Sequence, residues 1–478
     1  DLVRSRGLGD VYKRQDIYGR AIQPRVGAAW SVTPRTVLRG GWGRFYSNPN
    51  NDYLQTNGFS QTTSYSNSGS EGRTGVENKI ANPFPNGIRL PAGSSLGALS
   101  QVGQSFNFVN SRFRIPHVDQ FSFSLQHMPF SKGRLEIAYV ASRGSDLQSS
   151  RVFNEDDADL RDSCNLMLGG DPSRCDQGLP NPYFGLEPFV DTNWYISRTL
   201  SRYQLSRPYP QFQGITELMR NDGRNWYNAL QTSFSIRSRF TTLNTNYTWS
   251  KNLEQNGWLD PLRGVMQRGL TEFDRPHRFV LSAVSQLPFG RGRLFFHGQR
   301  GLLGKMISGW DNSVIVSQQS GRLWDLPSNV IQLKDPRTDI DWSASRVQAI
   351  HPCVMRWNEN NTVTMMRFSE VDYGCKEAHW LVTPRFNPRY TPFRSPNIRL
   401  QGTCMVDASL NKTTQITEKM RVQFRAEVFN LLNSFFLVRT QFNNNPENVN
   451  FGSIEKAAVS APNSNYPRQI QLGVKLLW

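Results

Sequence analysis

The chain has 478 residues, 37% of them hydrophobic and 12% aromatic, a length that fits either several soluble domains or one large barrel. Its 55 basic residues outnumber the 38 acidic ones, but they are dispersed along the chain. Without a basic cluster or a recognition-helix pattern, we expect no nucleic-acid partner, and we assign the charge to loops at a lipid surface or to ordinary solvated positions. No stretch of about 18 apolar residues occurs, which excludes membrane-spanning helices but not a β-barrel.

We interpret the first residues of the chain as foreign to the protein. Residues 5–15, SRGLGDVYKRQ, resemble a translated sequencing adaptor. We therefore expect residues 1–15 to be a cloning or assembly scar and exclude them from fold reasoning. In that case residues 16–478 are the C-terminal part of a longer protein, and the lack of a signal peptide says nothing about localisation.

From there on, apolar and polar residues alternate in short segments, which predicts strands because successive side chains point to opposite faces. Tight turns join many of these segments in pairs, for example at Thr33-Pro34-Arg35. We predict eleven strands. Two of them flank a turn at residues 130–133, one on each side, and the other nine are residues 23–32, 36–46, 226–237, 241–250, 278–287, 307–318, 405–411, 420–431 and 468–478.

Long polar connections separate these pairs. They are rich in Asn, Ser, Gly and Pro, and they cover residues 47–116, 142–225, 251–277, 319–401 and 433–466. Outer-membrane barrels alternate short periplasmic turns with long extracellular loops, whereas a sandwich or propeller predicts regular spacing or a blade repeat, and no repeat is present. We therefore predict an all-β, antiparallel transmembrane β-barrel with long extracellular loops in the outer membrane.

The predicted barrel is partial, because bacterial single-chain barrels have an even number of strands and eleven are counted here. A strand missed within a long connection, for example at residues 195–213, is the alternative explanation.

The final strand carries the clearest pattern. Its polar positions alternate with an apolar series that ends in an aromatic residue, as expected for a strand that faces lipid and stops at the membrane interface. We expect this strand to end at the periplasmic rim and to be an exposed edge unless another strand closes on it. The apolar series is Ile470, Leu472, Val474, Leu476 and Trp478.

The preceding strand has polar residues at every second position. In a barrel these side chains face the lumen, where they pair with one another or contact a plug or a ligand. The predicted lumen-lining residues are Arg421, Gln423, Arg425 and Glu427.

Five cysteines are present, and four of them form two local groups. Cys164 and Cys175 share one polar region and Cys353 and Cys375 another, which predicts two disulfides in an oxidising compartment, with Cys404 left over. Five unpaired thiols are the alternative. No pair has C-x-x-C spacing and no histidine has ligand spacing beside them, so we expect no metal site.

No catalytic constellation emerges from the sequence. Asp274 and His277 could form half of a triad, but no G-x-S-x-G motif accompanies them, and Pro276 indicates entry into a strand. No phosphate-binding loop is present, and acidic residues at 155–159 lack Ca²⁺-loop spacing. We expect no enzyme and no cofactor. Loop aromatics that could stack on a sugar or peptide are Trp194, Tyr195, Trp324 and Trp380.

An ordered series of segments carries a family resemblance. They include QPRVGAAWSVTPRTVLRGGWGRFY, RIPHVDQFSFSLQ, LEIAYVASRGSDL, DRPHRFVLSAVSQLPFGRGR, RVQFRAEVFNLLN and RQIQLGVKLLW. Together they resemble the C-terminal barrel of TonB-dependent outer-membrane receptors, of the Oar-like branch found in Acidobacteria. The resemblance extends from about residue 23 to residue 478.

This resemblance implies a barrel of about 22 strands that is filled by an N-terminal plug. It also implies a TonB box, which engages the inner-membrane energy complex, and a final strand that the barrel-assembly machinery recognises; most members end in Phe, whereas this chain ends in Trp478. The hypothesis is TonB-dependent uptake of an unidentified substrate. The alternatives are a structural or adhesive barrel that transports nothing and a secreted β-rich hydrolase.

Overall fold

The computed structural model describes most of the chain after residue 20. Residues 1–15, the predicted adaptor scar, lie outside the described part, so that prediction remains untested. The described residues are 21–47, 58–60, 63, 84, 87–88, 90–155, 157–190, 192–341, 344, 346–358, 360–434, 442–455 and 467–478.

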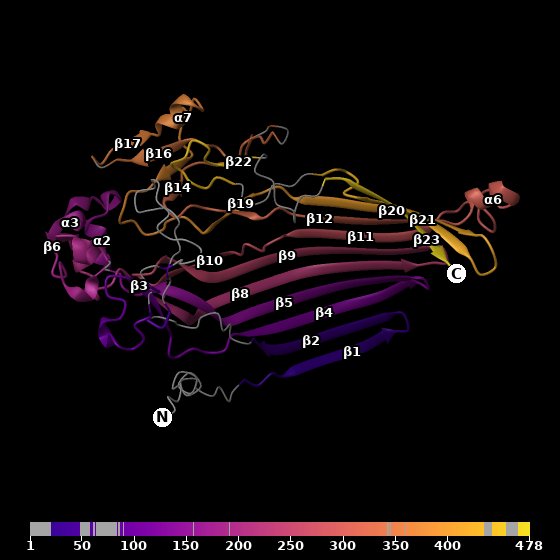
Figure 1. The fold of residues 1–478 in the computed structure, drawn as a ribbon. Helices are drawn as coiled ribbons and strands as arrows, with labels where there is room; N and C mark the ends of the chain where they lie inside the picture. The colour runs from indigo at the N-terminus through magenta and orange to yellow at the C-terminus, as the bar shows by residue number, and fades with distance from the viewer. Residues whose placement is uncertain are drawn as a thin grey trace.

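One antiparallel sheet runs through the molecule, and its main path contains the eleven strands that the sequence predicts (Figure 1). Each strand pairs with the next in chain order, which is the meander expected of an outer-membrane barrel. Within the described residues, β1 and β23 stand at the two ends of this path. In order, the strands are β1 (Arg25–Thr33), β2 (Thr36–Tyr46), β4 (His117–Phe130), β5 (Gly133–Val152), β8 (Gly214–Arg237), β9 (Thr241–Asp260), β11 (His277–Gln286), β12 (Trp310–Gln319), β20 (Thr403–Gln415), β21 (Arg421–Phe429) and β23 (Gln469–Leu477).

Three central strands are longer than predicted. Strands β5, β8 and β9 have 20, 24 and 20 residues. The sequence predicted loops at residues 142–225 and 251–277, and this prediction was wrong for the parts of these segments that extend the three strands. The extensions remain paired, for example Arg151 with Glu217, but lack an apolar alternation. Two further strands join them: β3 (Ser105–Val109) runs parallel to β8, and β10 (Val265–Leu270) runs antiparallel to β9.

The short connections lie at one end of the sheet, together with the C-terminus, and the long connections lie at the other (Figure 1). Strands β4 and β5 are joined by Ser131 and Lys132 alone. A Cβ atom at Gly133 would lie 2.4 Å from the Phe130 ring, so a larger residue there would displace this exposed ring. The connection from β11 to β12 is longer and contains helix α6 (Gly301–Ile307). Hairpin turns and loops are therefore sorted to opposite ends.

The strand register sorts side chains by polarity. Trp30 pairs with Leu38, and Leu38 with Leu125, so these residues share one face. On β23 the residues Ile470, Leu472, Val474 and Leu476 lie on the same face and are 45–75% exposed, and the following Trp478 is 89% exposed. A water-soluble protein rarely exposes so continuous an apolar surface, so this face contacts lipid. We call it the apolar face and the opposite one the polar face.

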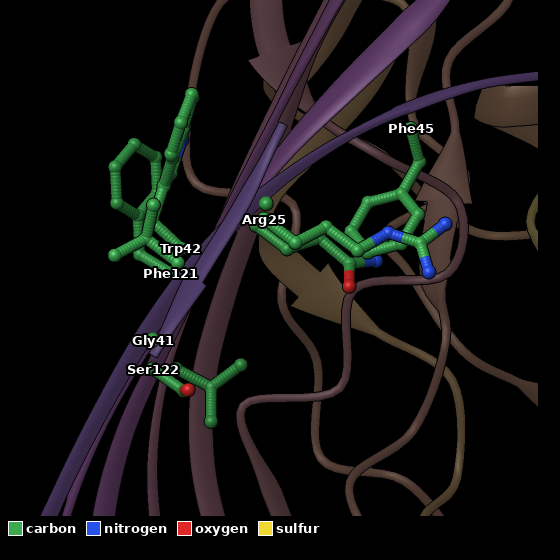
Figure 2. Close-up of a pocket in the computed structure, with 10 residues that line it drawn as sticks. Arg25, Gly41, Trp42, Phe45, Phe121 and Ser122 are labelled. Carbon is green, nitrogen blue, oxygen red and sulfur yellow. The ribbon is translucent and has the colours of Figure 1, made fainter. Parts of the chain in front are cut away.

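Figure 2 shows both faces near the first strands. Trp42 and Phe121 lie together on one side, with ring centres 6.5 Å apart. The Arg25 guanidinium lies 4.6 Å from the centre of the Phe45 ring on the other side. Trp42 and Phe45, which are three positions apart on β2, therefore lie on opposite faces of the sheet, as period-2 alternation requires.

The long connections fold into short helices and strands, whereas the sequence predicted irregular loops. We define the first loop unit as residues 90–110 and 157–213, and the second loop unit as residues 320–402 and 442–455. None of the helices in the described part of the chain is long and apolar enough to cross a membrane.

The first loop unit contains, besides β3, the elements α2 (Ala158–Ser163), α3 (Pro172–Asp176), β6 (Gly178–Pro180), α4 (Asn193–Ile196), β7 (Thr199–Ser201) and α5 (Arg202–Leu205). The second loop unit contains β13 (Leu323–Asp325), β14 (Val330–Gln332), β15 (Arg346–Gln348), β16 (Val354–Trp357), β17 (Val363–Met365), α7 (Arg367–Val371), β18 (Trp380–Val382), β19 (Arg394–Arg399) and β22 (Ser453–Glu455). A missed membrane strand at residues 195–213 is not found there, because β7 pairs only with β6.

The assignment of faces predicts the effect of charge at two adjacent positions in β11. Leu281→Arg places a cation on the apolar face and is expected to cost about 2–4 kcal/mol of unfolding free energy in a bilayer. Ser282→Arg places the same cation on the polar face and is expected to cost less than about 1 kcal/mol. Urea unfolding of protein reconstituted in vesicles measures both values. Equal costs at the two positions would contradict the assignment.

Candidate functional site

The first loop unit is built around its own small core. Val102, Phe189, Trp194, Phe212 and Ile215 are buried together and bring the two parts of the unit into contact. Cys164, at the C-terminal end of α2, is bonded to Cys175 in α3 with an S–S distance of 2.02 Å. The unit is therefore a folded body rather than a flexible loop.

The second loop unit has a larger core. Trp324 and Trp380 meet edge to face with ring centres 5.3 Å apart, and Phe451 packs against both from the later part of the chain. A four-stranded sheet in the order β14-β18-β16-β17 contributes Val330, Val354, Trp380 and Val382 to this core. Cys353 is bonded to Cys375, so in both units the structure joins the two cysteines that lie near each other in sequence. Cys404 is unpaired.

The loop aromatics considered as stacking platforms have a different role. Trp194, Trp324 and Trp380 are only 6%, 3% and 0% exposed, so they cannot stack on a ligand. Tyr195 packs against the first core. The possibility of ligand stacking therefore fails for the three tryptophans, because alternation along the long connections does not reveal which aromatic residues form local cores.

Buried and partly buried ion pairs fix the loop units to the extended strands and to the segment that precedes β11. Arg161 of α2 donates to both oxygens of Asp260, at 2.8 and 2.9 Å, and each residue is only 6% exposed. Arg399 of β19 donates to Asp274 at 2.6 Å. Arg394 contacts Glu254 of β9 and Asp325. These contacts hold the units in fixed positions at the end of the sheet.

The two loop units also touch each other. Arg385 of the second unit donates to both oxygens of Asp176 in the first, at 2.9 and 2.8 Å. Beside this pair, the rings of Tyr203 and Phe386 lie 5.2 Å apart. The units therefore form one joined surface at the end of the sheet with the long connections.

Asp274 and His277 belong to the sheet rather than to a catalytic site. His277 begins β11, as expected for a strand-entry motif. Asp274 is 2% exposed and accepts hydrogen bonds from Arg399 and from the Asn252 backbone N–H. Both side chains thus have structural partners. In the acidic stretch, the side chain of Asp157 caps helix α2.

The polar residues of β21 lie on the polar face. Arg421, Gln423, Arg425 and Glu427 pair in register with Leu477, Lys475, Gly473 and Gln471 of β23. Arg425 donates to Glu427 at 2.7 Å and to Asn411 of β20 at 3.3 Å. Arg425 therefore has an acidic partner two positions along its own strand and a polar partner on the neighbouring strand.

The second loop unit contains one cluster that the sequence reasoning missed. His351, Cys353 and His379 present potential metal-ligand atoms within 4.8 Å of one another. Burial, helped by His351 and Lys334, lowers the pKa of His379, which favours the neutral imidazole. The only sequence signal was the short spacing of His351 and Cys353, because the third member, His379, precedes a different strand, β18.

A continuous antiparallel meander with a lipid-exposed apolar face defines an integral β-sheet membrane protein. Residues 10–471 match the family described as outer membrane beta barrel domain. The chain therefore belongs to this family and is located in the outer membrane.

Comparison with solved structures gives low similarity spread over almost the whole chain. The outer membrane transporter YddB of Escherichia coli matches with 12% identity and a TM-score of 0.40, covering 95% of this chain and 40% of that chain. The FrpB iron transporter of Neisseria meningitidis matches with 8% identity and a TM-score of 0.38, covering 95% of this chain and 39% of that chain. The ferripyoverdine receptor of Pseudomonas aeruginosa matches with 7% identity and a TM-score of 0.35, covering 95% of this chain and 32% of that chain. The chain thus spans at most two fifths of these proteins. No curated protein matches the sequence.

The buried pair of Arg161 and Asp260 predicts a specific sensitivity of the first loop unit. Arg161→Met leaves the Asp260 carboxylate buried without its partner, which is expected to cost about 3–5 kcal/mol. Arg385→Met removes an arginine whose side chain is 71% exposed, and it is expected to cost at most about 1 kcal/mol. Limited proteolysis within residues 157–213 measures the difference. Similar cleavage rates in the two variants would contradict it.

Proposed function

We propose that the chain is the C-terminal part of the barrel of a TonB-dependent receptor that takes up an unidentified substrate without covalent chemistry. The proposal rests chiefly on one observation, the folded surface formed by the two loop units at one end of a membrane-embedded sheet. Disulfides, buried ion pairs and local cores give this surface a fixed shape. A preformed surface loses little conformational entropy on binding, which favours capture of a scarce solute.

In this proposal the polar face lines the barrel interior, with Arg421, Gln423, Arg425 and Glu427 beside the path of the substrate or a plug. Two apolar residues on the same face support a plug. Val284 and Ile315 are 54% and 50% exposed although they share this face with Ser282 and Ser313. Apolar side chains in a water-filled lumen are unfavourable unless another surface covers them.

The proposed partners follow from the same resemblance. A plug and a TonB box encoded before this segment would connect the barrel to the TonB complex, and the protein would belong to the Oar-like branch. The apolar series on β23 and the terminal Trp478 would provide the signal for the barrel-assembly machinery. Outer-membrane lipid would contact the apolar face.

The proposed orientation predicts which exposed positions are accessible from outside the cell. Ile196→Cys in the first loop unit and Leu302→Cys in α6 introduce thiols at positions that are 68% and 82% exposed. In a Cys404→Ser background, a membrane-impermeant maleimide should label the first variant in intact cells. The second should be labelled only after the outer membrane is permeabilised. The reverse pattern would contradict the orientation.

Energy coupling is tested separately with the full-length protein. We expect the complete gene to encode a plug and a TonB box upstream of this segment. The purified product should bind the periplasmic domain of TonB, and deletion of the box should abolish that binding. A complete gene without either element would contradict energy-coupled uptake and would favour a structural or adhesive barrel whose loop units bind partners.

A further inference from the structure

Strand pairing brings two histidines together from opposite ends of a long segment. In the second loop unit β16 and β18 run parallel, and Val354 lies opposite Trp380. The residues just before these strands are therefore neighbours, which places His351 and Cys353 beside His379. The two imidazole rings are stacked, with centres 4.0 Å apart and planes inclined by 6°.

The backbone holds both histidines in place. The His351 N–H donates to the Pro336 carbonyl at 2.8 Å, and the His351 carbonyl accepts from the Trp380 indole at 2.9 Å. The His379 N–H donates to the Cys353 carbonyl at 2.9 Å, and the His379 carbonyl accepts from the Leu333 N–H at 2.8 Å. The backbone positions of both histidines are thus fixed, and metal binding would require only their side chains to move.

One ring nitrogen of this pair lacks a partner. His379 Nδ1 is buried and forms no hydrogen bond within the described part of the chain. A buried polar atom left in this state costs free energy, whereas stacking alone would be satisfied by two apolar rings. The arrangement is therefore better explained by a ligand that accepts electron pairs from nitrogen than by packing.

We propose that His351 and His379 bind one divalent transition metal ion of borderline softness, with Cu²⁺ preferred over Zn²⁺. Imidazole nitrogen suits these ions, and affinity at nitrogen sites rises along the first row to Cu²⁺. Both residues are half-buried. Binding requires the two rings to turn out of their stacked arrangement, so that one nitrogen of each lies about 2.1 Å from a shared ion and water completes the coordination.

The disulfide limits the site to these two strong ligands. Cys353 Sγ lies in the same cluster but is bonded to Cys375, so it cannot act as a thiolate. Removing Cys375 alone would free this sulfur and convert the site into one with two nitrogens and one thiolate. The site does not depend on TonB-coupled uptake, so each proposal can fail without the other.

The test is titration of the whole chain, folded in detergent micelles, with Cu²⁺ and separately with Zn²⁺. Electron paramagnetic resonance of the Cu²⁺ form should show two nitrogen donors. His351→Gln and His379→Gln should each weaken Cu²⁺ binding at least about 10-fold, because each removes one of two ligands. His297→Gln, an exposed histidine in the connection between β11 and β12, should leave the affinity unchanged.

A second pair of variants separates metal binding from stability of the loop unit. Cys375→Ala should tighten Zn²⁺ binding at least about 10-fold over wild type, because it frees the Cys353 thiolate. The double variant Cys353→Ala/Cys375→Ala also lacks the disulfide but offers no thiolate, so it should not gain affinity. Equal Cu²⁺ affinity in wild type, His351→Gln and His379→Gln would overturn the proposal.

Discussion

The architecture depends on one constraint: every backbone N–H and C=O group in the hydrocarbon region of a membrane must be paired within the protein. The strands from β2 to β21 in the antiparallel meander meet it with hydrogen bonds on both sides, whereas within the described residues β1 and β23 are paired on one side. The period of two then sends alternate side chains to lipid. This explains why Ile470, Leu472 and Val474 remain exposed in a chain that has few apolar residues overall. A shift of one residue in register would bring Gln471 and Lys475 to the lipid face. The apolar alternation therefore specifies the register of the strand.

Outside the membrane the constraint is relaxed, and different interactions take over. The extensions of β5, β8 and β9 no longer alternate, and the loop units attached to them are stabilised by small aromatic cores, disulfides and buried ion pairs. Each unit is too small to bury a large core, so covalent and ionic contacts add the stability that burial alone does not provide. The paired Arg161 and Asp260 illustrate this division, because they connect α2 to the end of β9.

The sequence predicts the lipid-facing part well, because alternation is a local pattern. Eleven strands and the sorting of short and long connections follow from it, and the proximity of the cysteines in sequence matches their pairing in the structure. The loop units could not be predicted in this way. Trp324, Trp380 and Phe451 meet only through long-range folding, and no periodic signal marks them as core. The cluster of His351 and His379 could not be predicted for the same reason, because the parallel pairing of two short strands brings together residues that are far apart in sequence.

The central claim is that one face of the sheet contacts lipid, and it is tested most directly by spin labels placed singly from Phe279 to Ser285 in protein reconstituted in vesicles. Oxygen concentrates in lipid, whereas a polar nickel chelate remains in water. We expect oxygen accessibility to alternate along β11, with maxima at Phe279, Leu281 and Ala283 and minima at Val280, Ser282 and Val284. Accessibility to the chelate at Leu281 without such alternation would show that this face meets water and would contradict the account.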